Sequence, residues 1–465
     1  MTHFLRIFLA IAALPLAACA TTGAVTPPAS PHAPAAWSRT PVASAAGAQD
    51  LSRWWQQLDD PVLSATIEQA LKASPDIRSA LARLRQARAQ HALAAANRLP
   101  SVSGSVSASG SKRGESDATG SVSTGLDASW EPDLFGRLDA ALQAARADLA
   151  ATEDDLRNVQ VSLAAEVGVN YVELRGLQER LRIARSNLEM QAETLQLTEW
   201  RAQAGLVSSV DVEQARANLA QTRAQVPSLE TSIEQAEHRL AVLAGLEPAA
   251  LKARLEQPAA IPAPPEAVAI GIPAETLRQR PDVRAAEQQV IAETARLAQA
   301  KGARFPSFSL RGSIGTDTVT GAMTGGTSVV ASVVGSLVQT IFDGGRIRQQ
   351  IAIQDAAQER AVASYEAVVL TALEEVENAL VAIEKNRERE ASLATAVEAA
   401  HNAALLARQQ YEAGLADFQR VLDTERSVLS AEDSLASTRA SRTTAVVQLY
   451  KAAGGGWAES GGTGR

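Results

Sequence analysis

Few residues in this chain have the type and spacing that catalysis or metal binding requires. The five histidines are scattered without ligand-type spacing, and the single cysteine, Cys19, excludes an intramolecular disulfide and cysteine-based zinc clusters. The acidic pairs Asp59-Asp60 and Asp154-Asp155 are more simply helix starts or solvated charges than a catalytic dyad. No nucleophile elbow, phosphate-binding glycine loop or metal-binding helix motif is present. The sequence therefore predicts no catalytic residue, no metal and no dissociable cofactor.

The N-terminal segment has the features of a bacterial lipoprotein signal. Arg6 precedes an apolar run over residues 7–16 that is too short to span a bilayer. The following Leu16-Ala17-Ala18-Cys19 resembles the lipobox, in which the cysteine receives a diacylglycerol and an N-acyl chain. Ala20 rather than aspartate comes next, which in that pattern implies sorting to the outer membrane. An ordinary signal with an incidental cysteine is the alternative reading.

Composition favours long helices over a bulky globular core. Hydrophobic residues make up 46% of the 465 residues but aromatic residues only 4%, so the apolar content is mostly alanine, leucine and valine. The net charge of −8 argues against nucleic acid as a partner, because no basic patch is available to displace counterions from phosphates.

A very long helix is predicted over residues 137–203. Leucine or valine recurs every seven residues with one step of four, at Leu142, Leu149, Leu156, Leu163, Val167, Leu174, Leu181, Leu188 and Leu195. Such a seam predicts coiled-coil packing with a local stutter. The helix would extend roughly 100 Å at 1.5 Å per residue. Gly205 is suited to end it and Asp211 to begin a returning helix over about 210–243, so the turn is the tip of a helical hairpin.

Two stretches alternate with a period of two instead. In residues 101–109 every odd position is serine, and residues 121–130 show the same alternation up to Trp130, with a polar loop expected over 110–117. Strands with one hydroxyl-rich face and one apolar face match an outer-membrane barrel with a wet lumen. Taken alone, a soluble hairpin with one buried face explains the pattern equally well.

The chain is an internal duplication. Pro75 and Pro281 lie in matching motifs 206 residues apart, and Gly205 and Gly414 lie in matching motifs 209 residues apart. The second copy predicts strands over 306–316 and 328–341, the latter less cleanly alternating, and helices over 345–412 and 417–453. The predicted organisation is a signal peptide 1–18, a lipidated extended spacer 19–50, a first repeat 51–247, a proline-rich linker 248–273, a second repeat 274–457 and a flexible tail 458–465.

The fold class expected is mainly α with a membrane β-barrel portion. Four strands per chain cannot close a barrel, and open sheet edges in hydrocarbon would leave backbone groups unpaired. Two chains would supply eight strands and a plugged lumen, whereas three would supply twelve strands and a usable bore.

These features together resemble the outer membrane factors, the TolC-like exit ducts of tripartite efflux and type I secretion systems, and most closely their lipoprotein branch. The resemblance rests on the order and duplication of short motifs: the lipobox at Cys19, Trp54-Trp55 before Asp60-Pro61, Asp133-Leu-Phe-Gly-Arg137 with Phe342-Asp-Gly-Gly-Arg346, and the two tip motifs. It implies a homotrimer in outer-membrane lipid, with a helical tunnel through the periplasm, a periplasmic adaptor protein and an inner-membrane pump of the RND type as partners.

The resemblance also implies site residues. Gly205, Leu206, Val207, Ser208, Gly414 and Leu415 match the surface on which the adaptor docks. Asp423 and Arg426 match the positions that form the closed periplasmic gate in relatives. A ring of three aspartates would narrow the mouth and select against anions, and pairing with arginine would lock it. A plain surface pair on one helix is the alternative for these two residues.

The implied function is passive export of drugs or other small toxic compounds from the periplasm to the exterior. A lipid-anchored trimeric coiled-coil adhesin or envelope spacer is the main rival, and it explains the heptads but neither the duplicated amphipathic strands nor the tip motifs. A freely diffusing porin is a third possibility that needs no rods of this length.

Overall fold

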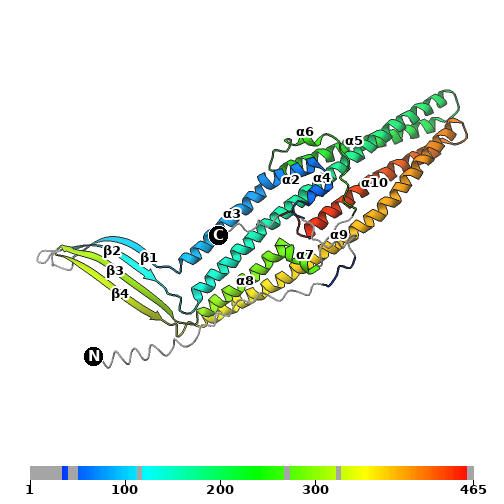
Figure 1. Cartoon of the computed structure of the whole chain (residues 1–465). Coiled ribbons are helices and arrows are strands. Elements are labelled where there is room, and N and C mark those ends of the chain that lie inside the picture. The colour runs from blue at the N-terminus through cyan, green and yellow to red at the C-terminus, as the bar shows by residue number, and fades with distance from the viewer. Residues whose placement is uncertain (1–33, 40–50, 113–117, 267–272, 321–325, 458–465) are drawn as a thin grey trace. The chain divides into compact units, whose positions relative to one another are not determined.

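The computed structural model describes residues 34–39, 51–112, 118–266, 273–320 and 326–457 (Figure 1). These residues fall into two compact units. One unit includes residues 83–153 and 285–366, and the other includes the described parts of 31–82, 154–284 and 367–465. Each unit therefore draws on both halves of the chain.

The order of elements repeats along the chain. The first half contains η2 (Trp54–Leu58), α2 (Pro61–Ala73), α3 (Pro75–Ala96), β1 (Ser101–Ser111), β2 (Thr119–Trp130), α4 (Arg137–Gln203) and α5 (Ser209–Leu243). After α6 (Lys252–Leu255), the second half contains α7 (Pro273–Gln279), α8 (Pro281–Gly302), β3 (Ser307–Thr320), β4 (Gly326–Val338), α9 (Arg346–Glu412) and α10 (Phe418–Ala452). Paired helices have equal lengths: 22 residues in α3 and α8, 67 in α4 and α9, and 35 in α5 and α10.

Local chemistry explains where the helices start. The Asp60 carboxylate accepts from the backbone N–H groups of Val62 and Leu63, both at 2.9 Å, and so caps α2. Pro75 and Pro281 occupy the first positions of α3 and α8, where a missing N–H costs nothing. Ser74 alone separates α2 from α3.

The first unit contains an antiparallel sheet with strand order β1-β2-β3-β4. Its register places serines opposite one another on one face, where hydroxyls bond across the strands: Ser107 to Ser123 at 2.7 Å and Ser109 to Ser121 at 2.8 Å. The predicted strands are present. β1 continues through Ser111 beyond the expected end, and residues 113–117 of the predicted loop lie outside the described residues.

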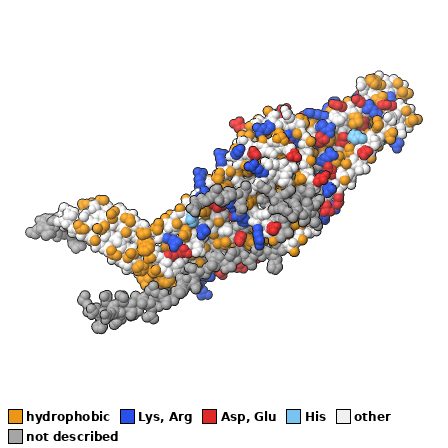
Figure 2. All heavy atoms as spheres, viewed as in Figure 1, with side chains coloured by type: hydrophobic (Ala, Val, Ile, Leu, Met, Phe, Trp, Pro, Cys, Tyr) orange, Lys and Arg blue, Asp and Glu red, His pale blue; other side chains and the backbone are white. Residues whose placement is uncertain are grey.

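The opposite face of the sheet is apolar and exposed. Val102, Leu126 and Ile314 lie there, with 68%, 55% and 56% of their surfaces accessible, and Figure 2 shows hydrophobic side chains spread over the strands. In β4 valines occupy both faces of the sheet. Val334 is paired with Arg311 and so lies on the hydroxyl-rich face, whereas the adjacent Val333 lies on the apolar face. This explains the imperfect alternation of that strand.

The second unit has a helical core built around aromatic side chains. Trp54 is fully buried and stacks on Tyr450 with ring centroids 5.5 Å apart. Leu163, Val167 and Leu174 of the predicted α4 seam are at most 3% exposed in this unit. The Trp54-Trp55 pair therefore packs the segment before α2 onto the helices.

The described part of the proline-rich linker, residues 248–266, lies against the helices. It contains the short helix α6, which the sequence did not indicate. The fully buried Arg175 donates to the carbonyl of Gln257 at 2.7 Å, and the Thr443 hydroxyl donates to that of Pro262 at 2.8 Å. Among the helices of the described ranges, none is both long enough and apolar enough to cross a bilayer.

Candidate functional site

The first predicted tip is a tight turn between α4 and α5. Gly205 has φ +74°, a left-handed conformation that glycine adopts at little cost. The Leu206 N–H donates to the Arg201 carbonyl at 2.9 Å and closes the end of α4. Ser208 caps α5: its hydroxyl accepts from the Asp211 N–H at 3.3 Å, and the Asp211 carboxylate accepts from the Ser208 N–H at 3.0 Å. Asp211 thus helps to begin α5, as predicted, but does so as one half of a reciprocal capping box with Ser208.

The second tip repeats the turn with a simpler cap. Gly414 has φ +72°, and the Leu415 N–H donates to the Gln410 carbonyl at 2.8 Å. The Asp417 carboxylate caps α10 by accepting from the Arg420 N–H at 3.1 Å. Both hairpins therefore turn through the same glycine geometry, as the repeated sequence motif predicted.

The predicted docking residues present apolar side chains to solvent at both tips. Leu206 is 67% exposed and Leu415 is 80% exposed. Ser208 is exposed as well, whereas Val207 is half-buried and packs against the tip core. Leu206 and Leu415 are thus available to a partner, while Val207 serves the hairpin itself.

A small core joins the two tips. Its buried members are Ala215, Tyr411, Phe418, Val421 and Leu422. The Tyr411 and Phe418 rings meet edge to face with centroids 5.9 Å apart. The Arg201 guanidinium lies 4.4 Å above the Tyr411 ring and donates to the Tyr411 carbonyl. The first hairpin thereby holds the C-terminal end of α9 in the second.

Polar contacts continue this junction along α4. They join Thr194 to Glu425 at 2.5 Å, Asn187 to Glu432 at 2.9 Å and Arg180 to Asp433 at 2.6 Å. All the acidic partners lie on α10. Beyond the tip core, hydrogen bonds and an ion pair supplement the apolar packing between the hairpins, and such contacts depend strongly on geometry and charge.

Glu425 is a buried acid that the sequence analysis missed. Only 4% of its surface is exposed, and this burial raises the pKa of its carboxyl, opposed by the Thr194 hydroxyl and by the charge of Arg408. A signal was present, because Glu425 falls in the spacing of the apolar stripe formed by Val421 and Val428 on α10. A carboxyl in such a stripe predicts burial.

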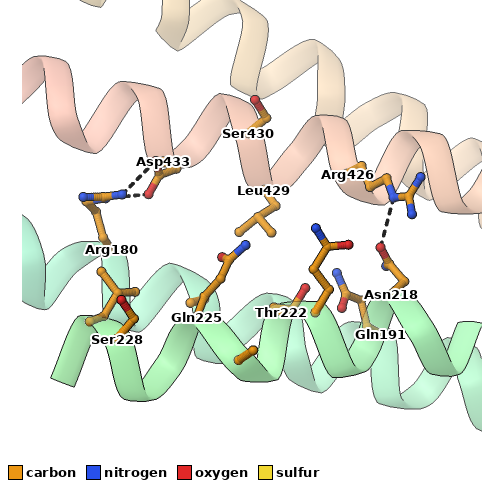
Figure 3. A pocket seen from close by; sticks show the side chains of 14 residues that line it. Arg180, Gln191, Asn218, Thr222, Gln225, Ser228, Arg426, Leu429, Ser430 and Asp433 are labelled. Atoms are coloured by element: carbon orange, nitrogen blue, oxygen red, sulfur yellow. Dashed lines mark hydrogen bonds and ion pairs between the residues drawn. The ribbon is translucent and has the colours of Figure 1, made fainter. Parts of the chain in front are cut away.

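The two predicted gate residues lie on the exposed surface of α10 but do not pair within one chain. The Gln419 amide donates to the Asp423 carboxylate at 2.9 Å. The Arg426 Nε donates to the Asn218 side-chain carbonyl on α5 at 3.0 Å, so its partner is an amide rather than Asp423 (Figure 3). Asp423 and Arg426 therefore do not form the plain surface pair that was the alternative, because each bonds to a neutral amide instead. Their assignment to a gate, with arginine as its lock, stays a prediction. A three-fold ring depends on neighbouring copies and stays a prediction.

The remaining predicted site falls outside the structure. Cys19 lies outside the described residues, so lipidation there stays a prediction. Within the described ranges no group of three or more histidine, cysteine or acidic residues is placed to hold a metal ion.

The family assignment follows from comparison of the whole chain with known proteins. Residues 66–246 and 272–455 match the model of the outer membrane efflux protein family. The chain belongs to this family. The two matched segments coincide with most of each half of the duplication described above.

Individual outer membrane efflux proteins resemble it over nearly their full length. The pyoverdine export outer membrane protein OpmQ of Pseudomonas putida is 35% identical over 456 residues, which cover 96% of each chain. Outer membrane protein OprJ of Pseudomonas aeruginosa is 32% identical, covering 96% of this chain and 95% of that one. Among solved structures, the outer-membrane channel OprN is 40% identical with a TM-score of 0.84, covering 93% of this chain and 100% of that one. VceC from Vibrio cholerae is 26% identical with a TM-score of 0.78, covering 88% and 99%.

As an outer membrane efflux protein, the chain is an exit duct of the outer membrane in an efflux pump. Its helices and four-stranded sheet correspond to the helical-barrel and β-barrel parts of the channel structures it resembles. Members of the family are channels, and this chain shares their fold along almost its entire length.

Proposed function

We propose that three copies of this chain assemble into a gated exit duct that carries small molecules from a periplasmic pump assembly to the exterior. The sheet is the observation that carries this proposal. β1 and β4 each pair on one side only, so both edges are open in a single chain. Joining β4 of one copy to β1 of the next three times yields twelve strands and removes every edge.

The two faces of the sheet indicate which of them would line the lumen of the barrel and which would contact lipid. The serine-rich face suits an aqueous lumen, because its hydroxyls bond to one another and have lone pairs left for water. The face that bears Val102, Leu126 and Ile314 suits lipid chains. Lipid chains on Cys19 would add an anchor at the outer membrane, since acyl chains tether a protein without spanning the bilayer.

The helical tips would receive a periplasmic adaptor protein. Leu206 and Leu415 extend from turns that are closed by backbone and capping hydrogen bonds, which would reduce the conformational entropy lost on binding. An inner-membrane pump, which we propose to be of the RND type, would supply the energy through this adaptor. The duct itself would catalyse no reaction and bind no cofactor besides its covalent lipid.

The gate would lie at the periplasmic end, at Asp423. Three copies would bring three exposed carboxylates from α10 toward one axis, where they would constrict the mouth and disfavour anions. Arg426 would act indirectly, because its bond to Asn218 ties α10 to the first hairpin. Opening would then require the two hairpins to separate.

Single-channel conductance in a planar bilayer tests this function. We expect the full-length protein to show a small conductance and Asp423→Ala to show a conductance several times larger, because the carboxylate ring is removed. The control is Glu398→Ala, which removes an exposed carboxylate from α9 and should leave the conductance unchanged. Absence of conductance from folded, inserted protein would exclude a channel and favour a lipid-anchored coiled-coil spacer.

A further inference from the structure

A pocket of about 930 Å³ lies among α4, α5 and α10 in the second unit (Figure 3). Ion-pair and amide contacts bound it at both ends. Arg180 and Asp433 form one bridge between α4 and α10, and Asn218 and Arg426 form the other between α5 and α10. The volume is in the range of pockets that hold small molecules.

Gln191 of α4 lines this pocket and has unmet hydrogen-bonding capacity. It is only 3% exposed, yet neither its side-chain oxygen nor its nitrogen has a hydrogen-bond partner among the described residues. A buried amide without partners is costly, and such groups are rare in folded proteins. Gln191 thus offers an amide NH₂ group as donor and a carbonyl oxygen as acceptor to a molecule in the pocket.

Arg426 supplies a positive charge that no acidic side chain of the described ranges neutralises. Its Nε bonds to the neutral amide of Asn218, and it forms no ion pair with any described residue. The other arginine of the pocket, Arg180, is already paired with Asp433 in a two-point contact at 2.6 and 3.3 Å. The terminal nitrogens of Arg426 therefore remain available to an anion.

The rest of the lining is mostly polar, with Ala184, Ala224, Leu229 and Leu429 as its apolar members. Thr222 and Asn218 are 3% and 5% exposed, and Gln225, Ser228 and Ser430 add further hydroxyl and amide groups. An apolar drug-like molecule would leave these groups unpaired. A compact solute with charged oxygens would instead satisfy the guanidinium, the amides and the hydroxyls together.

From these observations we propose that the pocket is a binding site for a small hydrophilic anion bearing carboxylate or phosphate oxygens, held by Arg426 and Gln191. Such an anion would contact α4, α5 and α10 at once. It would bridge the first hairpin to α10 of the second and stabilise their packed arrangement. The same chemistry could come from an acidic side chain of a partner protein, but the recessed Gln191 amide and the pocket volume favour a free solute.

Isothermal titration of the purified full-length protein with citrate and with inorganic phosphate tests the site. We expect saturable binding by at least one of these probes and a rise in the thermal unfolding midpoint. Arg426→Gln should weaken binding about tenfold or more, because a charge-assisted hydrogen bond is lost. Arg426→Lys should retain part of the affinity, which separates loss of the site from loss of the fold.

Gln191→Glu provides an independent variant, since it places a negative charge inside the pocket and should abolish binding. Arg216→Gln is the matched control, because Arg216 is an exposed arginine on α5 that is paired with Glu213 outside the pocket. The affinity of this variant for the anion should equal that of the unaltered protein. Failure of both probes to bind at millimolar concentration, or binding unaffected by Arg426→Gln and Gln191→Glu, would overturn the proposal. Binding of acidic peptides alone would assign the pocket to a partner side chain instead. None of these readouts depends on channel conductance.

Discussion

The two helical tips share a turn but differ in what they bury. Gly205 and Gly414 have nearly the same left-handed backbone, with φ of +74° and +72°. The second tip carries Tyr411, 1% exposed, where the alignment of the repeats places Ala202 in the first. The first tip instead exposes Trp200 by 59%. The two repeats therefore share the glycine turn, whereas most of the buried side chains that join the tips come from the second hairpin.

Shortening the buried Tyr411 side chain of the second tip should have the largest effect on the packing of the two tips. Tyr411→Ala removes a buried ring that contacts Phe418 and Arg201, and we expect a loss of about 3–5 kcal/mol in stability. Hydrogen exchange over residues 195–220 and 405–425 would measure this loss of stability, and we expect protection to decrease in both tips. Trp200→Ala is the control and should change protection little, because that side chain is mostly in solvent. Equal effects of the two variants would contradict the asymmetry.

The shared turn is tested by giving each glycine a side chain. Gly205→Ala and Gly414→Ala each force alanine into the left-handed region, at a cost of about 1–2 kcal/mol. A Cβ at Gly205 would have no heavy atom within 4 Å, and at Gly414 only the end of Arg201, at 3.9 Å, so strain rather than a clash would cause the loss. Hydrogen exchange at each turn should accelerate about tenfold in its own variant. A tip that is insensitive to the change would show that its turn tolerates another conformation.

A smaller, pH-dependent effect should distinguish the hairpins through Glu425, whose counterpart in the first repeat is the exposed Arg216. Burial raises the pKa of Glu425, so the folded chain holds this proton more tightly than the unfolded chain. The corresponding stability is present below the ordinary glutamate pKa and is lost as pH rises through the raised value. Glu425→Gln does not titrate there and should be more stable by about 1 kcal/mol at neutral pH.

Thermal unfolding of Glu425→Gln and the unaltered protein at several pH values would measure this difference. The gap in unfolding midpoints should shrink as the pH falls through the raised pKa of Glu425 towards the ordinary glutamate pKa, and should change no further below that value. Glu398→Gln, an exposed position on α9, should show no such trend. A gap that does not change with pH would mean that the substitution acts through packing rather than through the proton.

Much of the fold was predictable because its signals are local. The bounds of α4 agree with the prediction at both ends, and α5, α9 and α10 begin or end within one residue of it. Serine at every second position of residues 101–109 indicated β1 and its hydroxyl face before any strand partner was known. The helix α6 was missed, because its four residues are too few for periodicity to register.

The candidate site was predicted less completely. The tip glycines and the exposed Leu206 and Leu415 follow from short motifs, and the structure places them in tight turns. The partner of Arg426 was not predictable, since Asn218 is 208 residues away in sequence. The pocket was equally hidden, because its lining comes from three helices whose rotation about their own axes is set by packing.

The sequence by itself determined the duplication, the lengths of the long helices, the two-faced strands and the glycine turns. Each of these depends on residues a few positions apart, so backbone preference and periodicity are enough to specify them. Only the tertiary structure decided that Glu425 is buried, that Arg426 meets an amide and that Gln191 faces a pocket unpaired. These depend on which side chains of distant helices come within a few ångströms, and that is determined by the packing of the whole unit.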